Sequence, residues 1–133
     1  MSDEENFYRA LINSGFYSNL NVEYKIKHPS EPSNFISLDN IGHKNNTLFF
    51  FEGKSGKPEK AFGQLRTAYL SMRDPFYKRA IINYDKFENY SKIRLFYYSF
   101  KRGLLIEYDS SMVELKQHKF RDLNELADIL RNI

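Results

Sequence analysis

A run of four large apolar residues passes directly into two charged side chains in the stretch Leu48–Ser55, LFFFEGKS. Because side chains alternate across a strand, Glu52 and Lys54 share one face with Phe50. Both faces are apolar up to residue 52, which is typical of a central strand. A carboxylate and an ammonium that lose water at the end of such a strand need each other, a metal ion or a charged ligand.

A second carboxylate, Asp39, ends the preceding apolar segment at residues 35–39. We predict that this segment is a strand that pairs with residues 48–54 through a turn rich in Gly and Asn at residues 42–46. Such a hairpin brings Asp39 and Glu52 together at one end of the sheet. Two convergent carboxylates suit Mg²⁺ or Mn²⁺, and a neighbouring lysine positions a water or stabilises charge on a phosphate.

The triplet Glu-x-Lys is uninformative by itself, because it also occurs at residues 23–25 and 114–116. Only the triplet at residues 52–54 ends an apolar run and follows a segment that itself ends in a carboxylate. The context therefore selects Asp39, Glu52 and Lys54 as candidate catalytic residues.

The N-terminal half supplies three elements around these residues. Ser2 and Glu5 form a capping box that begins a helix over residues 3–14, and residues 21–27 alternate in polarity as a strand does. Pro58 suits the first turn of a second helix, whose apolar stripe ends near residue 72.

The C-terminal half is predicted to hold a helix at residues 76–90, followed by paired strands at residues 93–100 and 104–108. Asp122 and Glu125 then cap a last helix. The order of elements predicts the α/β class, with a mixed central β-sheet flanked by helices and an added C-terminal strand and helix. At 133 residues the chain is expected to form one domain, residues 1–133.

The constellation resembles the PD-(D/E)xK nuclease superfamily, which includes restriction endonucleases, archaeal Holliday-junction resolvases and RecB- or Cas4-like nucleases. Asp39, Glu52 and Lys54 match its motif, and Leu38 stands where the family name has a proline. The family's order of helix, three strands, helix and strand matches residues 3–100. The resemblance implies a restriction-endonuclease-like fold and hydrolysis of DNA, as an endo- or exonuclease, with Mg²⁺ or Mn²⁺.

Two further residue sets are implied only by this resemblance. In many members a glutamate of the first helix, placed before a Gly-aromatic pair, completes the metal site. That register selects Glu4 beside Asp39 and Glu52, with Glu5 as the alternative. RecB-like members also carry a Gln and a Tyr on the following helix; here Gln64 is a candidate DNA contact, and Tyr69 is expected in the core.

The charge balance permits a nucleic-acid partner, because the net charge is +3. The side chains expected to bind DNA, with a merely solvated surface as the alternative for each, are Lys57, Lys60, Gln64, Arg66, Arg73, Lys101 and Arg102. Cleavage of both DNA strands by so small a domain implies a possible homodimer.

Several other classes are disfavoured. The chain has no cysteine, which excludes disulfides and iron–sulfur clusters, and no apolar run approaches about 18 residues. We therefore expect an intracellular, cytoplasmic protein without a membrane segment or sorting signal. The stretch at residues 53–55 lacks the earlier glycine of an NTPase phosphate loop, the three histidines are scattered, and no Gly-x-Ser-x-Gly motif is present.

The sequence therefore predicts a Mg²⁺-dependent nuclease that acts on DNA. The alternative is a catalytically inactive module of the same fold that serves in DNA binding or protein assembly.

Overall fold

The computed structural model describes residues 2–18, 24–28, 31–73 and 92–133. Its described elements, in chain order, are α1 (Asp3–Asn13), β1 (Tyr17–Ser18), β2 (Tyr24–His28), β3 (Glu31–Leu38), β4 (Asn40–Lys44), β5 (Thr47–Gly53), α2 (Glu59–Arg73), β6 (Lys92–Ser99), β7 (Leu104–Tyr108), β8 (Glu114–Lys119) and α4 (Leu123–Arg131). The helix predicted at residues 76–90 lies outside the described residues.

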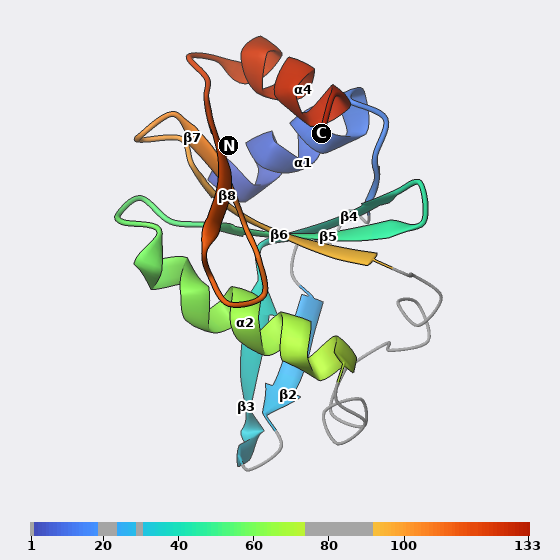
Figure 1. The fold of residues 1–133 in the computed structure, drawn as a ribbon, viewed down its shortest axis with the longest axis vertical. Helices are drawn as coiled ribbons and strands as arrows, with labels where there is room; N and C mark the ends of the chain where they lie inside the picture. Colours follow the sequence, from blue (N-terminus) through green and yellow to red (C-terminus); the bar gives the residue numbers. More distant parts are fainter. Residues whose placement is uncertain (1, 19–23, 29–30, 74–91) are drawn as a thin grey trace.

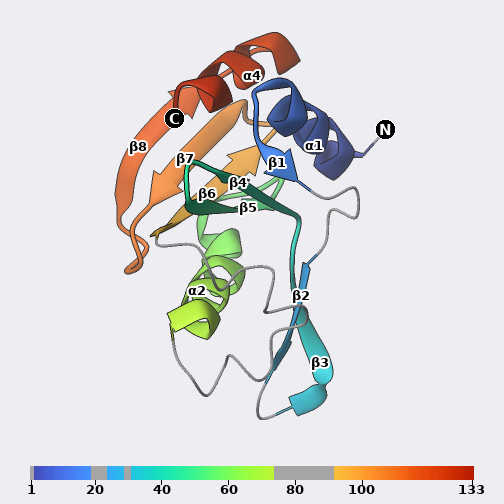
Figure 2. The same ribbon diagram turned by 90° about the vertical axis from the view of Figure 1, so that its right-hand side faces the viewer.

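The described strands form a six-stranded sheet in the order β1-β4-β5-β6-β7-β8, and β2 and β3 form a separate two-stranded sheet. β5 and β6 are parallel, whereas the other neighbouring strands are antiparallel. Helices α1 and α4 cover one face of the large sheet and α2 covers the other (Figure 1, Figure 2). The predicted α/β class, with a mixed sheet flanked by helices, is confirmed.

The central strand β5 separates two apolar clusters, as its alternation predicts. Leu48 and Phe50 pack on the α2 side with residues that include Ala61, Leu65 and Ala68. Phe49 and Phe51 pack on the opposite side with residues that include Phe7, Leu126 and Leu130. All four β5 residues are at most 2% exposed, so burial on both faces fixes the strand.

The predicted hairpin has the wrong boundaries. β3 pairs with β2, a bend at Asp39 follows, and β4 is the strand that pairs with β5. The turn is shorter than predicted: Asn45 and Asn46 occupy it with φ of 52° and 63°, as a two-residue hairpin turn requires. Gly42 lies within β4, where an added Cβ would be 3.0 Å from the Phe16 ring.

Both predicted helix caps are confirmed. The Ser2 hydroxyl accepts from the Glu5 N–H at 3.2 Å, and Asp122 accepts from the Glu125 N–H at 2.9 Å. Strand β8 was not predicted, because its residues are exposed or half-buried and it has no alternating apolar face. Within the described part of the chain, no helix has the length and apolarity needed to cross a membrane.

Candidate active site

The two candidate acids lie opposite each other where β4 and β5 begin to separate. Asn40 pairs with Phe51, so the ladder places Asp39 opposite Glu52. The Asp39 N–H donates to Glu52 Oε1 at 3.0 Å, and the Gly53 N–H donates to Asp39 Oδ2 at 2.9 Å. Each carboxylate therefore accepts a backbone hydrogen bond that holds it next to the other acid.

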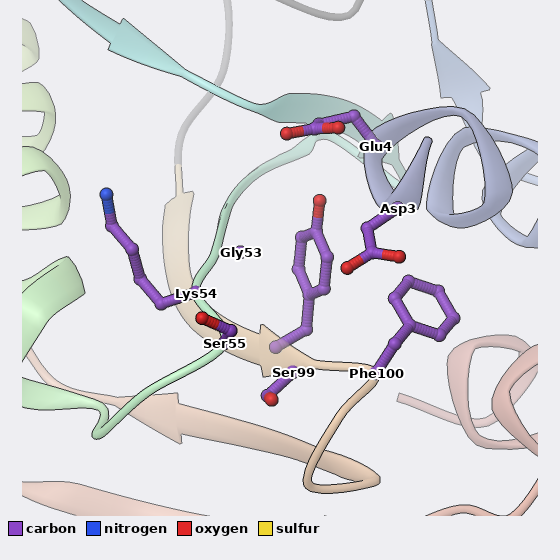
Figure 3. Close-up of a pocket in the computed structure, with 8 residues that line it drawn as sticks. Asp3, Glu4, Gly53, Lys54, Ser55, Ser99 and Phe100 are labelled. Atoms are coloured by element: carbon purple, nitrogen blue, oxygen red, sulfur yellow. The ribbon is translucent and has the colours of Figure 1, made fainter. Parts of the chain in front are cut away.

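Lys54 completes this group from the α2 side of the strand. Its Nζ lies 3.4 Å from Glu52 Oε2, and the side chains are 30% and 4% exposed respectively. Lys54 points toward α2, whereas Asp3 and Glu4 lie on the α1 side (Figure 3). The ammonium is therefore reachable from solvent although its acidic partner is not.

Gln64 of α2 contacts Lys54. In the amide orientation that satisfies both neighbours, its Oε1 accepts from Lys54 Nζ at 3.2 Å and its Nε2 donates to the Lys60 carbonyl at 3.3 Å. The structure therefore places this candidate DNA contact against the motif lysine.

Burial and crowding of negative charge dominate the electrostatics of Glu52. Burial, and next the charge of Asp39, raise its pKa from 4.5 to about 7, although the hydrogen bond from the Asp39 N–H and the contact with Lys54 act in the opposite direction. The cationic partner is therefore too weak to keep the buried carboxylate fully ionised near neutral pH. Such a pair of acids is stabilised by an additional positive charge.

Glu4 lies near this pair, in the first turn of α1. Its backbone carbonyl accepts from Asn40 Nδ2 at 3.1 Å, and Asn40 Oδ1 accepts from the Tyr98 hydroxyl at 2.7 Å. Glu5 is exposed. Among the described residues, no three His, Cys, Asp or Glu side chains gather into a group able to hold a metal ion.

A hollow of about 240 Å³ opens on the α1 side of the strand end. Its lining residues are Asp3, Glu4, Gly53, Lys54, Ser55, Tyr98, Ser99 and Phe100 (Figure 3). Two acidic side chains and a motif residue therefore border a solvent-accessible space.

The basic residues predicted to bind DNA lie in two segments at this end of the sheet and along α2. Lys57 and Lys60 are exposed at the start of α2, directly after β5, and Lys101 and Arg102 are exposed in the turn after β6. Because β5 and β6 are parallel, both segments leave the sheet at the Glu52 edge.

The other candidates on α2 lie farther along the helix. Arg66 and Arg73 are exposed, and the Arg73 guanidinium lies 5.4 Å from the centre of the Tyr69 ring. Tyr69 is half-buried against the α2-side cluster, which agrees with its predicted place in the core.

Three residues that hold the site together are not indicated by any pattern in the sequence. Asn40 and Tyr98 link α1 to the sheet through side-chain hydrogen bonds, for which a single sequence carries no periodic signal. The pattern Glu-x-Lys sets no requirement on its middle residue, which is Gly53 here. A Cβ at Gly53 would lie 2.5 Å from Tyr98 Cζ, so the middle residue must be small.

We compared the chain with protein-family models, with curated proteins and with solved structures, and found no match.

Proposed function

We propose that the chain is a metal-dependent nuclease that hydrolyses DNA phosphodiester bonds. The observation that carries the proposal is the pair of hydrogen bonds between Asp39 and the end of β5. Glu52 accepts from the Asp39 N–H, and Asp39 accepts from the Gly53 N–H. Holding a buried carboxylate beside a second acid costs free energy unless a cation compensates it. A stable fold that retains this arrangement is consistent with a cation site.

The donor set fits Mg²⁺ or Mn²⁺. These ions prefer carboxylate oxygen and keep several waters, so one or two protein carboxylates with substrate phosphate suffice. Asp39 and Glu52 would hold the ion, whereas Glu4, the third carboxylate that the family resemblance implies, does not gather with them among the described residues. When bound, the ion supplies a polarised phosphate oxygen and a bound water of lowered pKa.

Lys54 has the geometry to stabilise charge on the reacting phosphate. Its ammonium lies at the rim, 3.4 Å from Glu52, and Gln64 restrains it on the other side at 3.2 Å. A positive charge fixed in advance where negative charge develops lowers the barrier without reorganisation. Lys54 would also orient the attacking water for in-line displacement.

The exposed cations at the same sheet edge support a polyanionic substrate. Lys57 and Lys60 flank the site after β5, and Lys101 and Arg102 flank it after β6. Phosphate contacts of this kind position the backbone without reading sequence. DNA would therefore cross the Glu52 edge of the sheet.

The proposal is tested with labelled linear, circular and branched DNA, and with RNA, in Mg²⁺, Mn²⁺ or EDTA. We expect metal-dependent DNA cleavage that Asp39→Asn abolishes. Glu114→Gln is the matched control, because Glu114 belongs to an exposed Glu-x-Lys triplet on β8. DNA binding without cleavage under every metal condition would instead support the inactive module.

A further inference from the structure

We propose that Tyr97 is a positioning residue for the substrate: its hydroxyl fixes the loop between β5 and α2, residues 54–58, so that Lys57 meets the DNA backbone at the Glu52 end of the sheet. The inference rests on the proposed function, because DNA is the substrate that this loop would hold.

Tyr97 is the neighbour of Glu52 across the parallel strands β5 and β6. Paired residues share one face of a sheet, so the Tyr97 ring lies on the α2 side, in the same cluster as Ala61 and Leu65. Tyr97 is fully buried, and its hydroxyl donates to the Gly56 carbonyl at 2.6 Å. Its side chain therefore reaches from the strand beside the motif acid to the middle of the loop.

The next residue of β6 holds the start of the same loop. The Tyr98 carbonyl accepts from the Lys54 N–H at 3.1 Å. Two consecutive β6 residues therefore hold the loop on both sides of Ser55, one through its backbone and the other through its side chain. Only the bond from Tyr97 depends on a side chain, so a substitution there releases the middle of the loop and leaves its start in place.

Helix α2 fixes the far end of the loop. The Ala61 N–H donates to the Pro58 carbonyl at 2.9 Å, and Ala61 is fully buried in the α2-side cluster. Lys57 lies between this anchor and Gly56, and its side chain is exposed. The position of the Lys57 ammonium at the sheet edge therefore depends on the bond from Tyr97 to Gly56.

A fixed loop favours binding, because the cation is in place before DNA arrives and loses less freedom on contact. Lys54 has partners outside the loop, with its Nζ 3.4 Å from Glu52 Oε2 and 3.2 Å from Gln64 Oε1. Loss of the Tyr97 hydroxyl should therefore weaken DNA binding through Lys57 more than it slows the reaction.

The hydroxyl can be tested apart from the ring. A phenyl ring fills the same space in the cluster, so Tyr97→Phe removes only the bond to Gly56. Tyr108 of β7 belongs to the same cluster, and within the described residues its hydroxyl forms no hydrogen bond. Tyr108→Phe is therefore the matched control, because it is the same chemical change without loss of a loop contact.

Fluorescence anisotropy with short duplex DNA at several salt concentrations tests the route through Lys57. We expect Tyr97→Phe to raise the Kd by about 2- to 10-fold, as loss of one hydrogen bond does, and to reduce the slope of log affinity against log salt by about one unit. The double variant with Lys57→Ala should show the slope of Lys57→Ala alone, because both changes remove the same phosphate contact. Tyr108→Phe should bind as the wild type does.

Two results of this titration would overturn the inference: an unchanged slope in Tyr97→Phe, or additive losses of slope in the double variant. Single-turnover rates at saturating DNA supply the comparison with the chemical step. A Tyr97→Phe rate loss with an unchanged Kd would also overturn the inference, because Tyr97 would then act through Lys54 and not through Lys57.

Amide hydrogen exchange without DNA, measured by NMR, tests the loop by itself. The Lys60 N–H donates to the Lys57 carbonyl at 3.2 Å. This amide should exchange faster in Tyr97→Phe than in Tyr108→Phe or the wild type, while the amides of α1, on the opposite face of the sheet, stay as protected as before. Unchanged exchange would overturn the inference even if DNA binds. A wild type that binds no DNA would contradict the proposed function, and the exchange result would still decide whether Tyr97 fixes the loop.

Discussion

The carboxylates of Asp39 and Glu52 are held by an exchange of backbone donors: the Asp39 N–H binds Glu52 Oε1 at 3.0 Å and the Gly53 N–H binds Asp39 Oδ2 at 2.9 Å. The two bonds depend on the bend at Asp39, which turns its N–H toward β5 as the ladder ends. The acids thereby stay close even though burial and their mutual repulsion both disfavour the ionised form of Glu52.

This relationship predicts an unusual pH dependence of stability in EDTA. The folded pKa of Glu52, about 7, exceeds its ordinary value of 4.5, so the folded state holds more protons between these values. The free energy of unfolding should therefore fall as pH rises from 4.5 to about 7 and level off above that. The contribution of Glu52 is at most about 3 kcal/mol. Urea unfolding at pH 5 and pH 8 measures this change in the free energy of unfolding.

The control for this pH effect is Glu52→Gln, which removes the titrating group and keeps its shape. At each pH, the difference in the free energy of unfolding between the wild type and Glu52→Gln gives the contribution of Glu52. It excludes the contributions of His43 and His118, the two histidines whose pKa values burial lowers. Equal pH profiles for the two proteins would contradict the raised pKa.

Gly53→Ala should destabilise the fold by about 1–3 kcal/mol, because the new methyl would overlap Tyr98 at 2.5 Å and the ring is stacked on Phe7. Gly63→Ala should have the opposite effect on stability. Gly63 lies within α2, and a Cβ added there would have no neighbouring atom within 4 Å. There we expect a gain of about 1 kcal/mol from helix propensity. Thermal unfolding distinguishes them, and a neutral Gly53→Ala would contradict the packing described for Tyr98.

Gln64→Leu should lower the cleavage rate about tenfold with little change in DNA affinity, since Gln64 restrains Lys54 and a tenfold rate loss corresponds to about 1.4 kcal/mol. Single-turnover rates and DNA titrations separate the two effects. A loss of affinity with an unchanged rate would show instead that Gln64 contacts DNA directly.

Loss of one flanking cation, in Lys57→Ala or Arg102→Ala, should reduce the slope of log affinity against log salt by about one unit. Lys92 is the matched control, because it is exposed at the start of β6, the end opposite to the site. Fluorescence anisotropy with short duplex DNA at several salt concentrations measures each slope. An equal effect of Lys92→Ala would argue against a binding edge at the Glu52 end.

The sequence predicted the features that depend on local periodicity and capping. Leu48 to Phe51 alternate between two apolar clusters as expected, and the caps at Ser2 and Asp122 form where the capping pairs indicated. Asp39 and Glu52 lie opposite each other because β4 and β5 pair in register, and residues at matching positions of two paired strands share one face of the sheet.

The features that remained hidden depend on contacts between distant segments. Gly42 suggested a turn, but its missing side chain instead leaves room for Phe16 within a strand. The bond between Asn40 and Tyr98 joins residues 58 positions apart, and nothing local indicates such a pair. β8 is an exposed edge strand, so its sequence lacks the alternation of apolar and polar residues that predicts a half-buried strand.

The most direct test of the central claim is the single-turnover cleavage rate of end-labelled DNA in saturating Mg²⁺, compared between the wild type, Lys54→Ala and Lys116→Ala. Lys116 ends the exposed Glu-x-Lys triplet of β8 and is the matched control. We predict that Lys54→Ala lowers the rate at least about 100-fold, as loss of a charge-stabilising group does, while Lys116→Ala matches the wild type and EDTA stops cleavage. Cleavage that persists in EDTA, or equal rates for the two lysine variants, would contradict the assignment of Asp39, Glu52 and Lys54 as a metal-dependent nuclease site.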